Sequence, residues 1–173
     1  MKLKESLSGF LTNKGNSVYE LSQESPIMLV FLRHFGCIFC REALKEISDK
    51  VPLFEAYKIR TIFVHMSDME TAHGYFAEHG LSDAEQISDP ECNLYQSFNL
   101  AKGNFNQLFG LKNWIQGFKV TTKGIPVSLR QVGDGMQMPG IFMIWQGKVV
   151  DKYIHQFASD SPDYEALTNC CTT

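Results

Sequence analysis

The stretch Ile27-Met28-Leu29-Val30-Phe31-Leu32-Arg33-His34-Phe35-Gly36-Cys37-Ile38-Phe39-Cys40-Arg41 decides the fold. Its first six residues are all apolar, which is typical of a strand buried on both of its faces. From Cys37 to Asp49 the apolar residues take helical spacing, and Pro52 is expected to end or kink that helix. The stretch therefore predicts a buried strand that leads directly into a helix.

The chain after Asp49 continues this alternation. The pattern predicts strands at 59–66 and 86–88, and a hairpin at 141–154 that turns at Gln146-Gly147. Helix-start signals lie at Ser67-Asp68-Met69-Glu70 (a capping box with Ser67 as the cap), at Asp89-Pro90-Glu91 (Asp89 as the cap), and at Ser161-Pro162-Asp163. Gly80 is expected to end the first of these helices.

Strands that alternate with helices predict a parallel sheet, and the late hairpin adds an antiparallel edge. This is the element order of an α/β, thioredoxin-like fold. We expect a central mixed sheet flanked by helices, with an inserted, mostly helical segment at about 101–135.

Length and composition restrict the class of protein. A chain of 173 residues predicts one domain over 1–173, with 1–25 as an N-terminal extension and 168–173 as a flexible tail. The net charge of −3 excludes a globally basic nucleic-acid binder. The sequence has neither an apolar stretch long enough to span a membrane nor a secretory signal near Met1, so a cytoplasmic location is expected.

Five cysteines cannot all pair within one chain, so reactive thiols or metal ligation fit better than a disulfide scaffold. Cys37 and Cys40 form a Cys-x-x-Cys where the helix is expected to begin. Free N–H groups and the helix dipole there favour a thiolate, and Arg33, Arg41 and His34 add positive charge. Thiols in such settings have pKa values of about 3.5–7.5 instead of about 8.5. Cys40 lies one helical turn along, where it can close a disulfide on Cys37.

Two alternatives compete with this redox interpretation. One is half of a zinc site, for which His65, His73 and His79 are the nearby ligands. The other is a pair of buried structural cysteines. The strand-then-helix context favours the redox interpretation, under which no metal and no organic cofactor is expected.

A second motif, Met138-Pro139-Gly140, precedes the predicted hairpin. Proline fits the first residue of a strand better than its interior. In thioredoxin-like folds a cis-proline loop faces the Cys-x-x-Cys. We therefore expect Pro139 to be cis and to line the substrate groove together with the Met138 backbone.

Four segments carry a resemblance to a known family: 31–42, 88–91 with Tyr95, 137–142 and 161–164. Together they resemble the peroxiredoxin-like, AhpC/TSA-type branch of the thioredoxin superfamily, over about residues 27–167. The resemblance implies a thioredoxin fold with Cys37 as the attacking thiol and Cys40 as the resolving one. Typical peroxiredoxins place Pro and Thr seven and three residues before the attacking cysteine, where this chain has Val30 and His34.

The sequence thus predicts a thiol–disulfide oxidoreductase with an antioxidant role. Cys37 attacks a disulfide or a peroxide, Cys40 resolves the intermediate, and an external dithiol such as a thioredoxin or glutaredoxin system regenerates both thiols. One alternative is a thiol peroxidase that reduces hydrogen or alkyl peroxides. Another is a redox sensor or binding module without catalysis. Neither nucleic acid nor membrane is expected as a partner.

Other residues receive plainer interpretations. We expect Cys92 to pack in the core, Cys170 and Cys171 to lie in the tail, and His65 to be a hydrogen-bonded core histidine; His73, His79 and His155 receive no catalytic role. An aromatic-rich cluster at 105–118 is expected to cap the core. The segment 92–133 carries five of the 16 basic residues and none of the 19 acidic ones, so it is a candidate for steering substrates.

Overall fold

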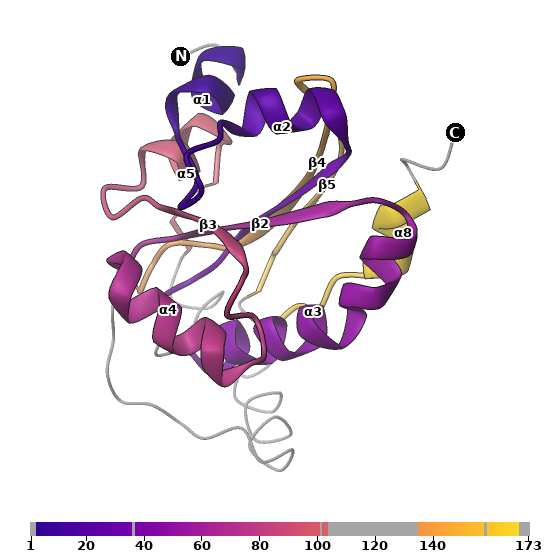
Figure 1. The fold of residues 1–173 in the computed structure, drawn as a ribbon. Helices are drawn as coiled ribbons and strands as arrows, with labels where there is room; N and C mark the ends of the chain where they lie inside the picture. Colours follow the sequence, from indigo (N-terminus) through magenta and orange to yellow (C-terminus); the bar gives the residue numbers. More distant parts are fainter. Residues whose placement is uncertain (1–2, 36, 101, 104–134, 158, 170–173) are drawn as a thin grey trace.

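The computed structural model describes residues 3–35, 37–100, 102–103, 135–157 and 159–169 (Figure 1). The elements follow in the order α1 (Leu3–Gly9), α2 (Val18–Glu24), β1 (Ile27–Phe31), α3 (Ile38–Ala56), β2 (Arg60–His65), α4 (Met69–Glu78), β3 (Glu85–Ser88), α5 (Asn93–Ser97), β4 (Gly140–Trp145), β5 (Lys148–Ile154) and α8 (Tyr164–Thr168). Within the described ranges, no helix is long and apolar enough to cross a membrane.

The strands form one mixed sheet in the order β3-β2-β1-β4-β5. β1 pairs with β2 in parallel, with Leu29 beside Ile62, and β2 pairs with β3 in parallel. On its other side β1 pairs with β4 in antiparallel orientation, with Leu29 beside Phe142, and β5 closes the hairpin. The predicted parallel sheet with an antiparallel edge is confirmed.

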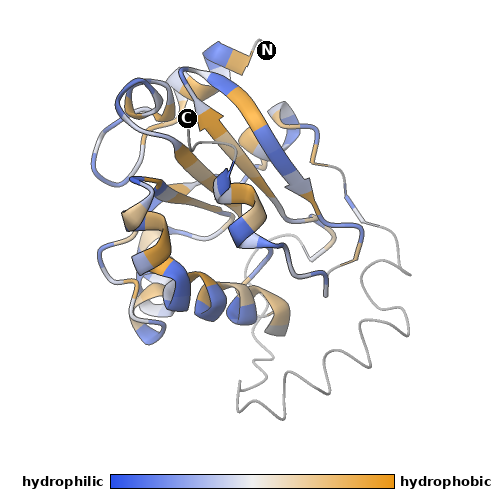
Figure 2. Cartoon of the chain, turned by 90° about the vertical axis from the view of Figure 1, so that its right-hand side faces the viewer, coloured by the Kyte–Doolittle hydropathy of each residue, from blue (hydrophilic) through white to orange (hydrophobic). Residues whose placement is uncertain are grey.

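Helices cover both faces of the sheet (Figure 1). Every residue of β1 is buried, and alternate side chains pack into two different cores, one on each face of the sheet. Met28 and Val30 face the core formed with α3, α4 and α8, whereas Ile27, Leu29 and Phe31 face the core formed with α1, α2 and α5. This explains why β1 is apolar without interruption. In Figure 2 the apolar residues gather in the strands, and hydrophilic residues appear on the surrounding helices.

The predicted capping box at Ser67 is wrong by one residue. Asp68 caps α4, and its carboxylate accepts hydrogen bonds from the backbone N–H and the hydroxyl of Thr71, at 2.7 and 2.8 Å. Ser67 is buried instead. Two adjacent residues were both good caps by type, and the ionised one takes the position beside the positive end of the helix dipole.

Two other helix boundaries differ from expectation. Pro52 does not end α3, which continues to Ala56, so the proline is accommodated inside the helix. The N-cap residue of α5 is Cys92 instead of the predicted Asp89, and the helix begins only at Asn93. The Asp89 carboxylate still accepts N–H bonds from Asn93, Leu94 and Tyr95. Pro90 therefore lies in a turn before the helix.

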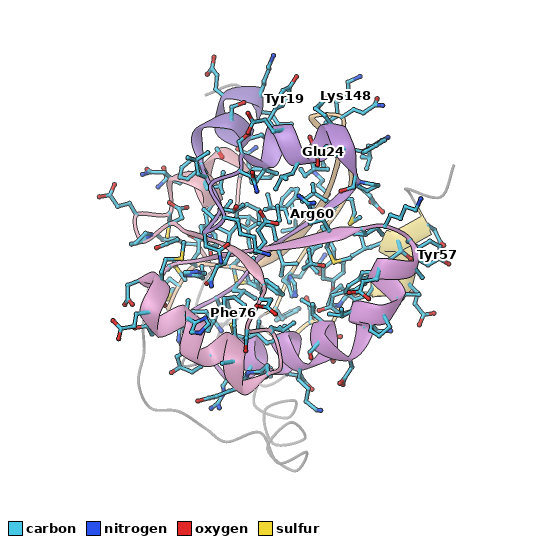
Figure 3. All side chains as sticks on the ribbon, in the orientation of Figure 1. Tyr19, Glu24, Tyr57, Arg60, Phe76 and Lys148 are labelled. Atoms are coloured by element: carbon cyan, nitrogen blue, oxygen red, sulfur yellow. The ribbon has the colours of Figure 1, made fainter. Side chains whose placement is uncertain are left out.

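The N-terminal extension is part of the folded core. Leu7 of α1, with Val18 and Leu21 of α2, packs against the same face of the sheet as Phe31. At one end of the molecule, where Figure 3 labels Tyr19 and Lys148, the hairpin turn meets α2. The N–H of Gly147 donates to the Ser22 hydroxyl at 3.0 Å.

Several predictions fall outside the described residues. The predicted helical insert at about 101–135 lies outside them except for residues 102–103 and Gly135. The aromatic cluster at 105–118, most of the basic segment 92–133, Cys170 and Cys171 lie outside them as well.

Candidate active site

The site lies at the carboxyl ends of β1 and β2, where the chain leaves the sheet for α3. Leu32 continues the parallel pairing, with its N–H donating to the Val64 carbonyl at 2.9 Å. The buried Tyr95 hydroxyl donates to the carbonyls of Leu32 and Val64, at 2.6 and 3.0 Å. Three elements are thereby tied together immediately before Arg33.

The loop from Arg33 to Cys37 is also anchored on its other side. The Phe35 ring is fully buried and stacks on Tyr75 of α4, with ring centroids 4.7 Å apart and planes 4° apart. Phe76 meets the same ring edge-on at 5.8 Å. The apolar residue in the middle of the motif thus fixes the path of the backbone that carries the thiol.

Cys37 is the N-cap residue of α3. Its N–H donates to the His34 carbonyl at 2.9 Å, and its own carbonyl accepts from the N–H groups of Cys40 and Arg41, at 3.1 and 3.3 Å. Only 8% of the residue is exposed. The thiol therefore sits at the positive end of a 19-residue helix, largely withdrawn from water.

Arg33 supplies the direct contact to this sulfur. Its guanidinium, in a residue that is 5% exposed, donates from Nη1 to the Cys37 Sγ at 2.9 Å and from Nη2 to the Gly135 carbonyl at 2.6 Å. A cationic donor at this distance interacts more strongly with a thiolate than with a thiol. The fork of Arg33 also ties the reactive cysteine to the segment that precedes Met138.

Cys40 lies deeper than Cys37, with 4% of the residue exposed. Its thiol donates to the Arg33 carbonyl at 3.7 Å. Burial, and secondarily a negative charge on Cys37, raise the pKa of Cys40 far above its ordinary value. Cys40 is therefore a protonated thiol at neutral pH, beside a cysteine with a cationic neighbour.

The other two predicted cationic residues are placed differently from Arg33. The Arg41 guanidinium pairs with the Glu78 carboxylate at 3.3 Å and lies over the Tyr75 ring. It joins α3 to α4, and its charge acts on Cys40. His34 is half-buried, and its backbone carbonyl accepts the hydrogen bond from the Cys37 N–H in the turn before α3.

The prediction of a cis peptide bond at Pro139 is wrong, because all described peptide bonds are trans. The trans form of an X–Pro bond is favoured by about 0.5–1 kcal/mol, and Pro139 precedes the extended residue Gly140 without a turn that would require the cis form. Met138 and Pro139 are both buried, and Met138 packs on Phe39.

Pro139 borders a small cavity that Cys40 also lines. The cavity measures about 30 Å³, the space that one water molecule takes in the liquid. Its lining includes Arg33, Phe39, Cys40, Pro139, His155, Asp160 and Tyr164. Cys40 is the one described cysteine in this lining.

His155 also lines this cavity, and no signal in the sequence analysis pointed to that position. Burial lowers its pKa to about 4, against the opposing effects of the Asp160 charge and of backbone groups at Pro139 and Asp160. The ring is therefore neutral at pH 7. The only local signal was a histidine directly after a hairpin strand, which does not reveal that it will line a cavity with Cys40.

Of the three histidines proposed as zinc ligands, His65 and His79 contact other groups and His73 is exposed. His65 is fully buried, and its Nε2 is 3.0 Å from the Gln86 amide oxygen. The His79 Nδ1 is 2.8 Å from the Tyr75 carbonyl, and His73 is exposed. In the part of the chain that the structure describes, no three His, Cys, Asp or Glu residues gather as metal ligands. Cys92 is buried in the core, on the α1, α2 and α5 side of the sheet.

The fold and the paired thiols define a thioredoxin-like redox protein. The AhpC/TSA antioxidant enzyme family matches residues 46–156, which is more than half of the chain, and the chain belongs to this family. This confirms the predicted family and the predicted class of enzyme, an antioxidant oxidoreductase. The family reduces peroxides and draws on thioredoxin-type reductants. The matched region begins after Cys40 and so includes neither Cys37 nor Cys40.

Curated relatives are similar over most of the chain. The Arabidopsis thaliana thioredoxin-like protein AAED1, chloroplastic, is 23% identical over 169 residues, covering 91% of this chain and 68% of the relative. The prostamide/prostaglandin F synthase of Salmo salar is 28% identical over 150 residues, covering 85% and 73%.

Solved structures share the fold at lower identity. Peroxiredoxin Q of Xanthomonas campestris superimposes with a TM-score of 0.67 at 12% identity, covering 99% of this chain and 94% of the other. The peroxidoxin BcpB of Mycobacterium tuberculosis gives a TM-score of 0.61 at 15% identity, covering 94% and 89%. These likenesses confirm the predicted thioredoxin-like architecture.

Proposed function

We propose that this protein is a thiol peroxidase in which Cys37 attacks the peroxide and Cys40 resolves the product. The Cys37 thiolate attacks one peroxide oxygen, the O–O bond breaks, and the other oxygen takes a proton and leaves as an alcohol or water. Cys37 is then a sulfenic acid. The Cys40 sulfur attacks the Cys37 sulfur, the S–O bond breaks, and water leaves the new disulfide. An external dithiol is oxidised as it restores both thiols.

The contact between Arg33 and the Cys37 sulfur carries this proposal. A guanidinium at 2.9 Å and the helix N-terminus both favour the thiolate, while the neighbouring Cys40 is held protonated. The two thiols are thus prepared for different steps. The small exposed fraction of Cys37 supports a small substrate, such as hydrogen peroxide or an alkyl peroxide, over a protein disulfide.

A thiol–disulfide oxidoreductase is the second candidate. Val30 and His34 occupy the positions where typical peroxiredoxins have Pro and Thr, and this departure supports an oxidant other than a simple peroxide. In that case Cys37 forms a mixed disulfide, which Cys40 resolves with release of a thiol.

The test is a pair of assays on the wild type and on Cys37→Ser, Cys40→Ser and Cys92→Ser. One assay follows consumption of hydrogen peroxide and an alkyl hydroperoxide, and the other follows reduction of a protein disulfide. Cys37→Ser is expected to abolish activity, Cys40→Ser to retain the first turnover but accumulate a trapped Cys37 intermediate, and Cys92→Ser to behave as wild type. Full peroxidase activity in Cys37→Ser contradicts the proposal, and absence of both activities in the wild type favours a redox sensor.

The regenerating partner is proposed to be a thioredoxin or glutaredoxin system, and the location the cytoplasm, where both would be at hand. Coupled assays with each reductant distinguish the partners. Cell fractionation tests the location against a plastid, since one relative is named as chloroplastic.

A further inference from the structure

The resolving step of the proposed function must carry one proton from the buried Cys40 thiol to the hydroxide that leaves Cys37. Cys40 must lose its thiol proton as its sulfur attacks Cys37, yet burial keeps that proton tightly bound. In the reduced protein the S–H group points to the Arg33 carbonyl, which cannot take a proton. A base on the Cys40 side of the site would take this proton as the sulfur attacks and would pass it to the leaving hydroxide.

His155 is the one imidazole in the lining of the cavity that Cys40 borders. Its Nδ1 is buried and has no hydrogen-bond partner within the described part of the chain. The cavity has room for one water molecule, and a buried water is normally held by two to four polar groups. The Cys40 sulfur, the His155 imidazole and the Tyr164 hydroxyl all belong to residues that line this space.

Asp160 completes the arrangement. Its carboxylate accepts N–H bonds from Gln156 and Phe157, at 2.9 and 2.8 Å, which fixes the loop that follows His155. The same negative charge favours the protonated imidazole. Asp160 thus both orients the loop and stabilises the charge that His155 would acquire.

We propose that His155 is the general base of the resolving step: it takes the Cys40 proton, directly or through one water in the cavity, while the Cys40–Cys37 bond forms. The Cys37 S–O bond breaks in the same step, and the departing hydroxide takes that proton from the protonated imidazole and leaves as water, so His155 is neutral again. When a dithiol later attacks Cys37 in the disulfide, the S–S bond breaks and the leaving Cys40 sulfur takes up a proton released by that dithiol. This inference rests on the proposed function.

The pH dependence of such a step follows from the groups around the ring. They come from every neighbouring element: Arg33 before α3, Cys40 on α3, Tyr153 on β5, Asp160 after β5, and Tyr164 on α8. Neutral His155 is the active form, so the resolving rate should be flat from about pH 5.5 to 8 and should fall as the pH approaches the His155 pKa of about 4. Without the imidazole, the rate should follow the Cys40 thiolate and rise about tenfold per pH unit.

The experiment gives one equivalent of hydrogen peroxide to the reduced full chain and measures two rates. A sulfenic-acid-trapping reagent and thiol counting separate the oxidation of Cys37 from its conversion to the disulfide. In His155→Gln the first rate should stay within about twofold of wild type, while the second should fall about 100-fold at pH 7 and acquire the steep pH profile. The matched control is His73→Gln, which changes an exposed histidine on α4.

Asp160→Asn provides a second route if His155→Gln does not fold. The amide can keep one N–H acceptor for the loop but loses the charge, so the low-pH fall in the resolving rate should move to lower pH. If His155→Gln forms the disulfide at the wild-type rate with the wild-type pH profile, His155 is not the base. If the wild type itself forms no Cys37–Cys40 disulfide, the proposed function fails as well.

Discussion

Arg33 is expected to control the reactivity of Cys37, and Arg33→Met tests this most directly. The substitution removes a charge-assisted hydrogen bond at 2.9 Å within a largely buried site. Hydrogen bonds to charged groups contribute about 1.5–3 kcal/mol, and the loss falls on the thiolate in preference to the thiol. At about 1.4 kcal/mol per factor of ten, an anionic Cys37 sulfur should lose a factor of about 10 to 150 in stabilisation.

The observed rate should fall by less than this factor. A thiolate that loses stabilisation becomes intrinsically more nucleophilic, and this offsets nearly half of the loss on a logarithmic scale. The second-order rate with hydrogen peroxide, or with an alkylating reagent, should therefore fall about 4- to 15-fold. Stopped-flow measurement under pseudo-first-order conditions, with Cys40 and Cys92 replaced by serine, isolates Cys37.

Two variants separate the hydrogen bond from the charge. Arg33→Lys keeps a positive charge but loses the planar fork that reaches both the sulfur and the Gly135 carbonyl, so it should recover only part of the rate. Arg41→Met removes another buried guanidinium, one that pairs with Glu78, and should change the rate less than Arg33→Met. If a folded Arg33→Met protein reacts at the wild-type rate, Arg33 does not control the reactivity of Cys37. If Arg33→Met and Arg41→Met lose the same amount of rate, the effect comes from the positive charge in general and not from the hydrogen bond to the sulfur.

Three further predictions concern the framework of the site. Burial lowers the pKa of His65 from its ordinary 6.5 to about 4. Between these two pH values the unfolded chain therefore binds a proton at His65 that the folded chain does not bind. The free energy of unfolding should therefore fall by at most about 3 kcal/mol as the pH drops from 6.5 to 4, and denaturant titrations of His65→Gln should show a shallower pH dependence than wild type. Tyr95→Phe removes the hydroxyl that bonds the Leu32 and Val64 carbonyls and should lower stability by about 1–3 kcal/mol; an unchanged denaturation midpoint contradicts this. Gly147→Ala places a Cβ 2.6 Å from the Tyr19 ring at a φ of +72°, whereas Gly15→Ala, at a φ of +81°, meets nothing within 4 Å. Gly15→Ala should lower the free energy of unfolding only by the left-handed strain of about 1–2 kcal/mol. Gly147→Ala should lower it further because of the contact with the Tyr19 ring, and an equal loss in the two variants contradicts a close contact between the turn and α2.

The local part of the site was accessible from the sequence. An uninterrupted apolar run followed by helical spacing predicted β1 and α3. A strand buried on both faces is apolar at every position, whereas a helix buried on one face has apolar residues three or four positions apart. Arg33, Cys37 and Cys40 lie within one loop and one helical turn, so their proximity needed no tertiary information. The cap at Asp68 was missed because two neighbouring residue types can both cap, and only the fold selects between them.

The remaining part depends on contacts between distant segments. The Arg33 guanidinium reaches the Gly135 carbonyl across 102 positions of the chain, and His155 meets the cavity beside Cys40 only after the hairpin returns along the sheet. Neither contact leaves a periodic trace. The isomer at Pro139 was inferred from a property of the fold class, whereas in this chain the trans form fits the start of β4.

The two cysteines three positions apart receive opposite environments, and this difference orders the proposed reaction. A guanidinium contacts the Cys37 sulfur, while desolvation and the charge on Cys37 both raise the pKa of Cys40. As long as Cys37 is anionic, Cys40 therefore remains a poor nucleophile and does not compete for peroxide. Oxidation of Cys37 to the neutral sulfenic acid removes one of the two effects that hold the Cys40 proton. Cys40 thus becomes easier to ionise only when its target has formed, and the remaining cost, set by burial, is the part that a base in the adjacent cavity would have to offset.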